Sequence, residues 1–257
     1  MRIYPKGVRI DSTNFDPIPF WQAGAQFVAL NLQTCDKSCQ LNQGKFRDNG
    51  NCGYVSKRLI HDTTHESTTV VPCSVCKKDS KLRKVITIEF LGARHLPMNS
   101  CAYIELELVS DPLTSRGTQV FRVKVKGYFC ALPKDRMLMR FIVKNPKTEI
   151  LRIVYLSPEQ TLPTGRVKSS YEKGFIYLQY SFPIIGIRHG LRSVLMETIR
   201  GMPRELTTLL LKITETQVGF CERHEEKAYS EPAEIIKGKI SSNLLGSVTE
   251  AVFQNKK

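Results

Sequence analysis

Short runs of alternating apolar and polar residues dominate the chain from residue 85 onward. Turn residues separate these runs, which occupy residues 85–93, 102–110, 120–128, 137–145, 175–182 and 207–214. A period of two residues places the apolar side chains on one face of a β-strand. Since no helical segments recur between the runs, the pattern predicts a β-sandwich rather than a parallel sheet.

One of these runs carries basic side chains on a single face. In residues 120–125, Arg122 and Lys124 alternate with Phe121, Val123 and Val125. The wider stretch 116–173 holds thirteen basic and four acidic residues, so it contributes most of the chain's formal net charge of +14. Such a charge attracts polyanions, namely nucleic acid, anionic membrane or a phosphorylated partner. A solvated sheet face with edge-protecting lysines explains the pattern equally well.

The N-terminal residues follow a different pattern. Residues 20–34 predict a short helix that leads into a buried strand, with Val28, Leu30 and Leu32 on one face. An irregular loop precedes them, and the Asn-Gly and Gly of residues 47–54 predict a tight turn. Loop, helix, strand and turn form one unit of an α/β fold. Because a strand at 28–33 has no evident neighbour, we expect this unit to be poorly stable alone and the sandwich to be the self-sufficient fold.

Composition sets the expected boundaries. Residues 1–58 form the α/β segment, residues 59–83 a polar linker, residues 84–215 the sandwich and residues 216–257 a partly disordered tail. The second half of residues 145–173, with its prolines and basic end, predicts a long loop. No apolar run is long enough to cross a bilayer and no signal pattern is present at the start, so we expect a soluble, intracellular protein.

The eight cysteines are expected to be free thiols, because nothing indicates secretion. Two of them form a CxxC pattern, which can be half of a zinc site. The ligands considered for such a site are Cys73, Cys76, Cys35, Cys39, His61 and His65. The alternative is reduced thiols in a connector.

Several stretches carry a resemblance to one protein family. RIYPKG, FWQAGAQFVALNLQT and LNQGKFRDNGNCGY, within residues 2–54, resemble the end of the catalytic TIM barrel (Y half) of phosphoinositide-specific phospholipase C. KVITIEFLGARHLP, YIELEL, LMRFIVKN, FIYLQYSFPIIGIRHGLRSVLM and LTTLLLKI resemble the C2 domain that follows that barrel. The phrase LGARHLP, at residues 91–97, is most similar to the gamma class.

This resemblance implies a fold and a function. The fold class is an α/β fragment, the end of a TIM barrel, followed by an all-β C2-like sandwich. The implied enzyme hydrolyses phosphatidylinositol 4,5-bisphosphate to diacylglycerol and inositol trisphosphate in signalling. Its expected location is cytoplasmic and peripherally membrane-associated. Its partners are phosphoinositide lipids and signalling proteins, and no nucleic acid is expected because no RNA-recognition or helix-turn-helix pattern is visible.

Two site residues follow from the resemblance. Arg2 matches the arginine that contacts the phosphorylated inositol, and Tyr4 matches the tyrosine that packs against the inositol ring. A guanidinium is suited to bidentate phosphate binding. Val8 matches a residue of the membrane-touching barrel rim. Without the resemblance, packing at the rim would be the simpler explanation of Arg2 and Tyr4.

The catalytic residues of the family are expected elsewhere. Its histidine general base and acid and its calcium ligands lie in the X half, and none of the five histidines here sits in a comparable motif. We therefore expect no catalytic or metal residue in this chain and no activity from the chain alone. The C2 loops are expected to bind no calcium, since Cys101, Asn145 and Lys147 stand where calcium-binding relatives carry acidic residues. A non-enzymatic module that binds anionic membrane or a partner is the alternative function.

Overall fold

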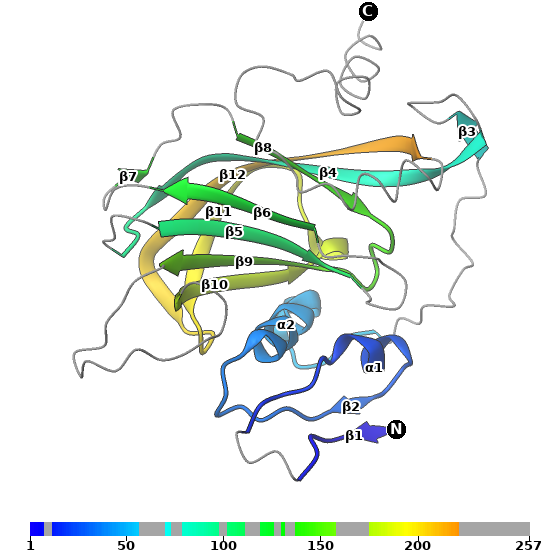
Figure 1. Ribbon diagram of the computed structural model, residues 1–257, viewed down its shortest axis with the longest axis vertical. Helices are drawn as coiled ribbons and strands as arrows, with labels where there is room; N and C mark the ends of the chain where they lie inside the picture. The colour runs from blue at the N-terminus through cyan, green and yellow to red at the C-terminus, as the bar shows by residue number, and fades with distance from the viewer. Residues whose placement is uncertain are drawn as a thin grey trace, which may run out of the picture.

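The computed structural model describes residues 1–7, 12–56, 70–72, 79–97, 102–110, 119–125, 130–131, 137–157 and 175–220. We call residues 1–56 the N-terminal segment and the described residues between 70 and 220 the sandwich. The N-terminal segment lies against one side of the sandwich (Figure 1). An α/β segment followed by an all-β sandwich, as the sequence predicted, is thus confirmed. Within the described ranges, no helix has the length and apolar character needed to span a bilayer.

The N-terminal segment contains short strands and two α-helices. Its elements are β1 (Arg2–Ile3), α1 (Ile18–Gln22), β2 (Phe27–Val28), α2 (Lys37–Phe46) and the 3-10 helix η1 (Asp48–Asn51). The helix and tight turn expected around residues 20 and 50 are present, and in the turn both Asn49 and Gly50 have positive φ. The expected strand at 28–33 is shorter than predicted, because the chain turns where the Thr34 amide donates to the Asn31 carbonyl at 3.2 Å. Leu32, predicted on a buried face, is consequently 74% exposed.

Strand β2 is also not alone. It pairs in parallel with β1, with Arg2 opposite Phe27 and Ile3 opposite Val28. The expectation of a strand without a neighbour was therefore wrong. The first residues of the chain supply the partner, which a pattern confined to residues 20–34 does not reveal.

Helix α2 was not predicted from the sequence. Its mid-helix glycine and mostly polar composition lower its helical signal. The cap explains why it forms: the Asp36 side chain accepts a hydrogen bond from the Cys39 amide at 3.1 Å. The same carboxylate accepts a bond from the Asn14 amide at 3.0 Å, which ties the start of the helix to the preceding loop.

The sandwich is built from two layers that meet where β10 and β11 pair at only two positions. One layer has the order β6-β5-β9-β10, and the other has β11-β12-β4-β8, with β3 and β7 as short additions to β4. All the neighbouring strands of the sandwich are antiparallel. The strands are β3 (Val70–Pro72), β4 (Asp79–Arg94), β5 (Ala102–Val109), β6 (Gln119–Val125), β7 (Cys130–Ala131), β8 (Met137–Val143), β9 (Ile150–Ser157), β10 (Phe175–Pro183), β11 (Gly190–Thr198) and β12 (Pro203–Phe220).

The six alternating runs all form strands, namely β4, β5, β6, β8, β10 and β12. Their inward residues make one core between the layers, in which Ile88, Leu106, Met139 and Leu211 are at most 1% exposed. On β6 the predicted face is confirmed: Arg122 and Lys124 are exposed while the apolar residues between them are buried. Period-two patterning therefore located these strands correctly.

Strand β9 was missed because it does not alternate. Ile153, Val154 and Tyr155 are all at most 1% exposed, since the core covers one face and α2 lies over the other (Figure 1). A strand buried on both faces reads as a continuous apolar run. Strand β11 was likewise not named in advance.

Two expected boundaries differ from the strand limits. Strand β4 begins at Asp79, inside the expected linker, because it pairs there with β3 and with the end of β12. Strand β12 continues to Phe220, past residue 215, where we expected the tail to begin. The expected loop at 158–173 and most of the expected tail lie outside the described residues.

Candidate functional site

Both predicted site residues lie at the edge of the N-terminal segment. Arg2 is on β1, Tyr4 follows it, and both are exposed, with Tyr4 at 63%. Between them Ile3 is half-buried. The Arg2 guanidinium carbon lies 5.3 Å from the centre of the Phe27 ring, over its face. Ring and guanidinium attract each other, so Arg2 is oriented while it stays accessible.

Backbone bonds hold this edge in place. The Ala29 amide donates to the Ile3 carbonyl at 2.9 Å, and the Gln26 and Phe27 amides donate to the Met1 carbonyl at 3.2 and 3.3 Å. The edge therefore depends on the pairing of β1 with β2. Val8, the third residue carried over from the family, lies outside the described residues.

The residues proposed as zinc ligands are only partly described. Cys35 and Cys39 are free thiols, and Cys39 is buried. Burial, and then the charge of Asp36, raises the pKa of the Cys39 thiol to about 11. Because the thiolate is the metal-binding form, this environment disfavours a ligand role for Cys39. Cys73, Cys76, His61 and His65 lie outside the described residues.

Calcium fits the described residues no better. Within the described ranges, no group of three or more His, Cys, Asp or Glu side chains is arranged to hold a metal ion. At the turn between β8 and β9, the Asn145 side-chain oxygen accepts from the Lys147 amide at 3.1 Å. That oxygen caps the turn and is directed at the backbone. Cys101 lies outside the described residues.

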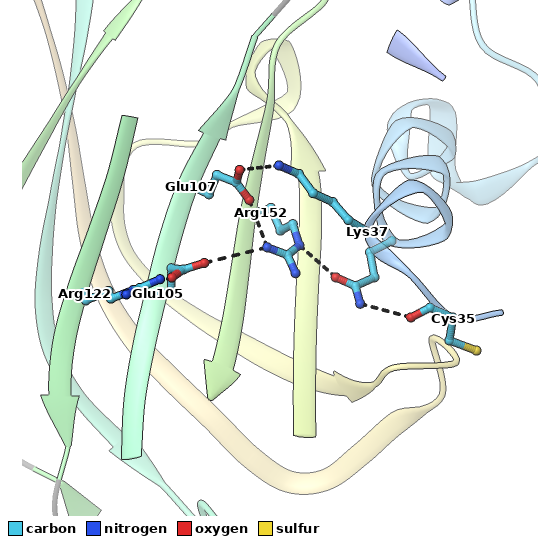
Figure 2. A network of polar contacts seen from close by, with 7 residues as sticks. Cys35, Lys37, Glu105, Glu107, Arg122 and Arg152 are labelled. Carbon is cyan, nitrogen blue, oxygen red and sulfur yellow. Dashed lines mark hydrogen bonds and ion pairs between the residues drawn. The ribbon is translucent and has the colours of Figure 1, made fainter. Parts of the chain in front are cut away.

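The N-terminal segment is joined to the sandwich by a buried polar network (Figure 2). At its centre Arg152 of β9 donates through Nε to the Gln40 side-chain oxygen at 2.8 Å and through Nη1 to Glu107 at 2.9 Å. Lys37 of α2 pairs with the same Glu107. Glu105 lies 3.9 Å from Arg152 Nη1. The Arg152 and Glu107 side chains are only 6% and 8% exposed, so neither charge is satisfied by bulk water.

A second group of contacts lies one helical turn further along α2. The Gln43 side chain accepts a bond from Gln179 of β10 at 2.7 Å. After the helix, Arg47 pairs with Glu197, and its guanidinium lies 4.2 Å from the centre of the Tyr180 ring. Residues at positions 40, 43 and 47 share one helix face, so the helix presents a polar face to the sheet.

Apolar residues complete the junction. Ile18 and Leu41 from the N-terminal segment pack with Val109 and Ile150 of the sandwich, and the half-buried Trp21 packs against them. Apolar burial and buried ion pairs therefore act on the same interface. This junction was not predicted from the sequence. The signal available was the acidic pair at 105 and 107 and Arg152 within otherwise apolar strands.

The chain is similar to known proteins in both sequence and structure. Residues 1–59 match the family described as "Phosphatidylinositol-specific phospholipase C, Y domain". The rat protein named 1-phosphatidylinositol 4,5-bisphosphate phosphodiesterase gamma-2 is 31% identical over 239 residues, which are 89% of this chain and 17% of that protein. The human protein named 1-phosphatidylinositol 4,5-bisphosphate phosphodiesterase eta-1 is 61% identical over 178 residues, which are 64% of this chain and 10% of that protein.

The eta-1 identity is higher than the gamma-2 identity, over a shorter alignment. Among solved structures, PLC21 of S. officinalis matches with a TM-score of 0.63 and 25% identity, over 97% of this chain and 30% of that chain. The chain thus spans less than a fifth of the length of these curated relatives. The gamma-2 alignment, over 89% of the chain, includes residues of both the N-terminal segment and the sandwich. By these matches and by its fold, the chain is similar to the end of the Y domain and the C2-like sandwich of phosphoinositide-specific phospholipase C.

Proposed function

We propose that this chain is the C-terminal portion of an enzyme that hydrolyses phosphatidylinositol 4,5-bisphosphate to diacylglycerol and inositol trisphosphate. The observation that carries the proposal is the Y-domain match of residues 1–59, in which Arg2 and Tyr4 are both exposed at one edge. In this role they form one wall of the head-group pocket. The complete protein acts at the cytoplasmic face of a membrane, as a peripherally attached protein with phosphoinositide lipids, and signalling proteins, as its partners.

Each residue has a distinct task in the proposed pocket. The Arg2 guanidinium, held over Phe27, donates two hydrogen bonds to one phosphate group of the inositol. The Tyr4 ring offers an apolar face to the inositol ring and a hydroxyl at its rim. Calcium would lower the pKa of the attacking inositol hydroxyl, but the described residues do not supply its ligands. We assign the general base, the general acid and the calcium ligands to the X half of the enzyme, as the family resemblance implies.

Head-group binding can be tested on the purified chain. We expect inositol 1,4,5-trisphosphate to shift the backbone amide resonances of residues 2–4, because phosphate binds next to them. Arg2→Leu should weaken the binding at least about tenfold, as expected when a charge-assisted bidentate contact is lost. Lys6→Leu removes an exposed cation of the same edge and should change the affinity less than about twofold. Equal losses in the two variants would argue against a specific role for Arg2.

Catalysis by the isolated chain is a separate test. We expect no calcium-dependent hydrolysis of phosphatidylinositol 4,5-bisphosphate vesicles by the 257-residue chain. Clear hydrolysis would show that the catalytic groups are present in it and would overturn this division of labour.

The alternative function is a non-enzymatic module that binds anionic membrane. The exposed pair Arg122 and Lys124 on β6 favours it. In that case the chain should sediment with anionic vesicles in the absence of calcium, and salt should release it. Failure to bind at low salt would remove this alternative.

A further inference from the structure

Leucine side chains are exposed on the outer face of the hairpin formed by β11 and β12. Leu191, Leu195 and Leu210 are 63%, 40% and 45% exposed. We call these three residues the leucine face. Single exposed leucines are common on protein surfaces, but a contiguous group marks an interaction site.

The strand register makes these leucines contiguous. Ser193 is opposite Leu210, with Leu191 and Leu195 two residues to either side of Ser193. Diagonal neighbours of this kind are within reach of leucine side chains. On the other side of Leu210, the residue opposite on β4 is Gly92, which has no side chain to cover it. The leucine face therefore spans both strands of the hairpin.

The turn end of the hairpin extends this apolar surface. Strand β12 has an irregularity in its register, with extra residues between the pairs Glu197–Pro203 and Leu195–Thr208. Within and beside it, Met202 and Leu206 are 65% and 68% exposed. Leu206 has a φ of 64°, a left-handed conformation that leucine rarely adopts. Backbone strain that exposes a leucine opposes stability, and such outliers cluster at functional sites.

Cations stand at both ends of the leucine face. Arg188 and Lys212 are exposed at one end, and Arg200 and Arg204 are exposed at the turn. A single anionic group would need convergent cations, whereas these are spread along the hairpin. An extended layer of negative charge matches this distribution.

Most acidic side chains of the hairpin are already neutralised. Glu197 is buried in its ion pair with Arg47, and Glu215 pairs with Lys84 at 3.0 Å. Of the three acidic residues in β11 and β12, only Glu205 is exposed. The outer surface of the hairpin is thus both apolar and positive.

We propose that the outer face of the β11–β12 hairpin docks on an anionic lipid bilayer. The leucines and Met202 enter the boundary between head groups and acyl chains, and the four cations contact lipid phosphates and carboxylates. Long basic side chains can reach the head groups while their stems lie along apolar surface. This inference rests on the proposed membrane role, and it assigns that role to a surface different from both the Arg2 edge and the basic face of β6.

Co-sedimentation with vesicles tests the inference. The vesicles contain phosphatidylcholine and phosphatidylserine in a two-to-one ratio with a calcium chelator and no phosphoinositide, so the Arg2 edge has no ligand. We expect the triple variant L191S, L195S, L210S to bind at least about tenfold more weakly than the unchanged chain. The variant R200Q, R204Q should bind about tenfold or more weakly and show a shallower salt dependence.

Matched controls separate this surface from others. Leu32→Ser changes a leucine of the N-terminal segment that is even more exposed, at 74%, and should alter binding less than about twofold. R122Q, K124Q removes two cations from β6 and should have a similarly small effect. Circular dichroism and thermal melting of every variant establish that the fold is retained.

Three outcomes would overturn the inference. If R122Q, K124Q abolishes binding and the hairpin variants do not, the β6 face carries the membrane contact. If the unchanged chain fails to bind at low salt, no membrane surface exists here, while the separate inositol trisphosphate titration still decides the role of Arg2. If ultracentrifugation shows a dimer that the triple leucine variant abolishes and vesicles do not compete with, the leucine face binds a second copy of the chain.

Discussion

Glu149, the residue before β9, is a buried carboxyl group with one unsatisfied oxygen. The residue is 2% exposed. One side-chain oxygen accepts from the Ser110 hydroxyl at 2.7 Å and from the Lys144 amide at 3.3 Å, while the other has no hydrogen-bond partner among the described residues. Burial raises the pKa of Glu149 to about 7, and the bonds from Ser110 and Lys144 oppose that rise. The site thus favours the neutral form of Glu149 more than water does.

This residue predicts a pH-dependent stability. The pKa of Glu149 in the folded chain, about 7, lies above the ordinary value of 4.5. The contribution of Glu149 to folding stability is therefore complete below pH 4.5 and is lost as the pH rises through 7. We expect Glu149→Gln, which stays neutral, to raise the melting temperature relative to the unchanged chain more at pH 8 than at pH 5. The exposed carboxyl of Glu205 provides the control E205Q. An equal effect of E149Q at both pH values would contradict the prediction.

At the scale of elements, α2 determines how the N-terminal segment meets the sandwich. Gly44 lies in the face of α2 that contacts β10, where a Cβ atom would be 2.6 Å from the Ser181 Cβ and 2.9 Å from its carbonyl carbon. The backbone of the helix therefore approaches the strand directly. This close approach explains why a helix of modest propensity contains a glycine at its centre.

Substitution of Gly44 should change the stability in the direction opposite to that expected from helix propensity. Gly→Ala in a helix ordinarily stabilises by about 1 kcal/mol. Here we expect Gly44→Ala to destabilise by roughly 1–3 kcal/mol, because the added methyl must displace β10 or the helix. Denaturant unfolding measures the change. Gly7→Ala, where a Cβ meets nothing within 4 Å, is the control. Stabilisation by G44A would show that α2 and β10 can move apart at little cost in free energy.

At the scale of the whole molecule, the Arg152 network makes one unit of two parts that the sequence separates. Arg152 of β9 contacts Gln40 of α2 and Glu107 of β5, so it links the N-terminal segment to two neighbouring strands of one sandwich layer. Removing one member of a buried ion network leaves the remaining charges uncompensated. The resulting loss of stability is larger than the stability that the intact network adds relative to an apolar interface. Residues 1–54 are therefore still expected to be poorly stable in isolation, because the sandwich supplies their partners in this network.

A pair of arginine variants tests the unit. Arg152→Ala should lower the free energy of unfolding by about 3–5 kcal/mol, since Glu107 then remains buried beside Lys37 alone. Arg122→Ala removes a 58% exposed arginine that also pairs with Glu105, and should cost no more than about 1 kcal/mol. Calorimetry of the unchanged chain should show a single transition. Two separate transitions, or equal costs for the two variants, would contradict this coupling.

Features that depend on local pattern could be predicted from the amino-acid sequence. Alternation in six runs located six strands and the exposed face of Arg122 and Lys124, because side-chain direction in a strand depends only on position along it. The stretch around Arg2 and Tyr4 likewise carried the family resemblance in its own residues.

Features that depend on distant partners are set when the chain folds. Strand β9 lacks alternation because α2 covers its second face, and β2 has a partner because the chain's first residues return beside it. The junction brings Gln40 to Arg152, which are 112 residues apart, and Gln43 to Gln179, which are 136 apart. The hairpin register likewise places Leu210 between Leu191 and Leu195. Since a buried polar side chain is stable only with its partners present, no stretch read alone could predict this junction.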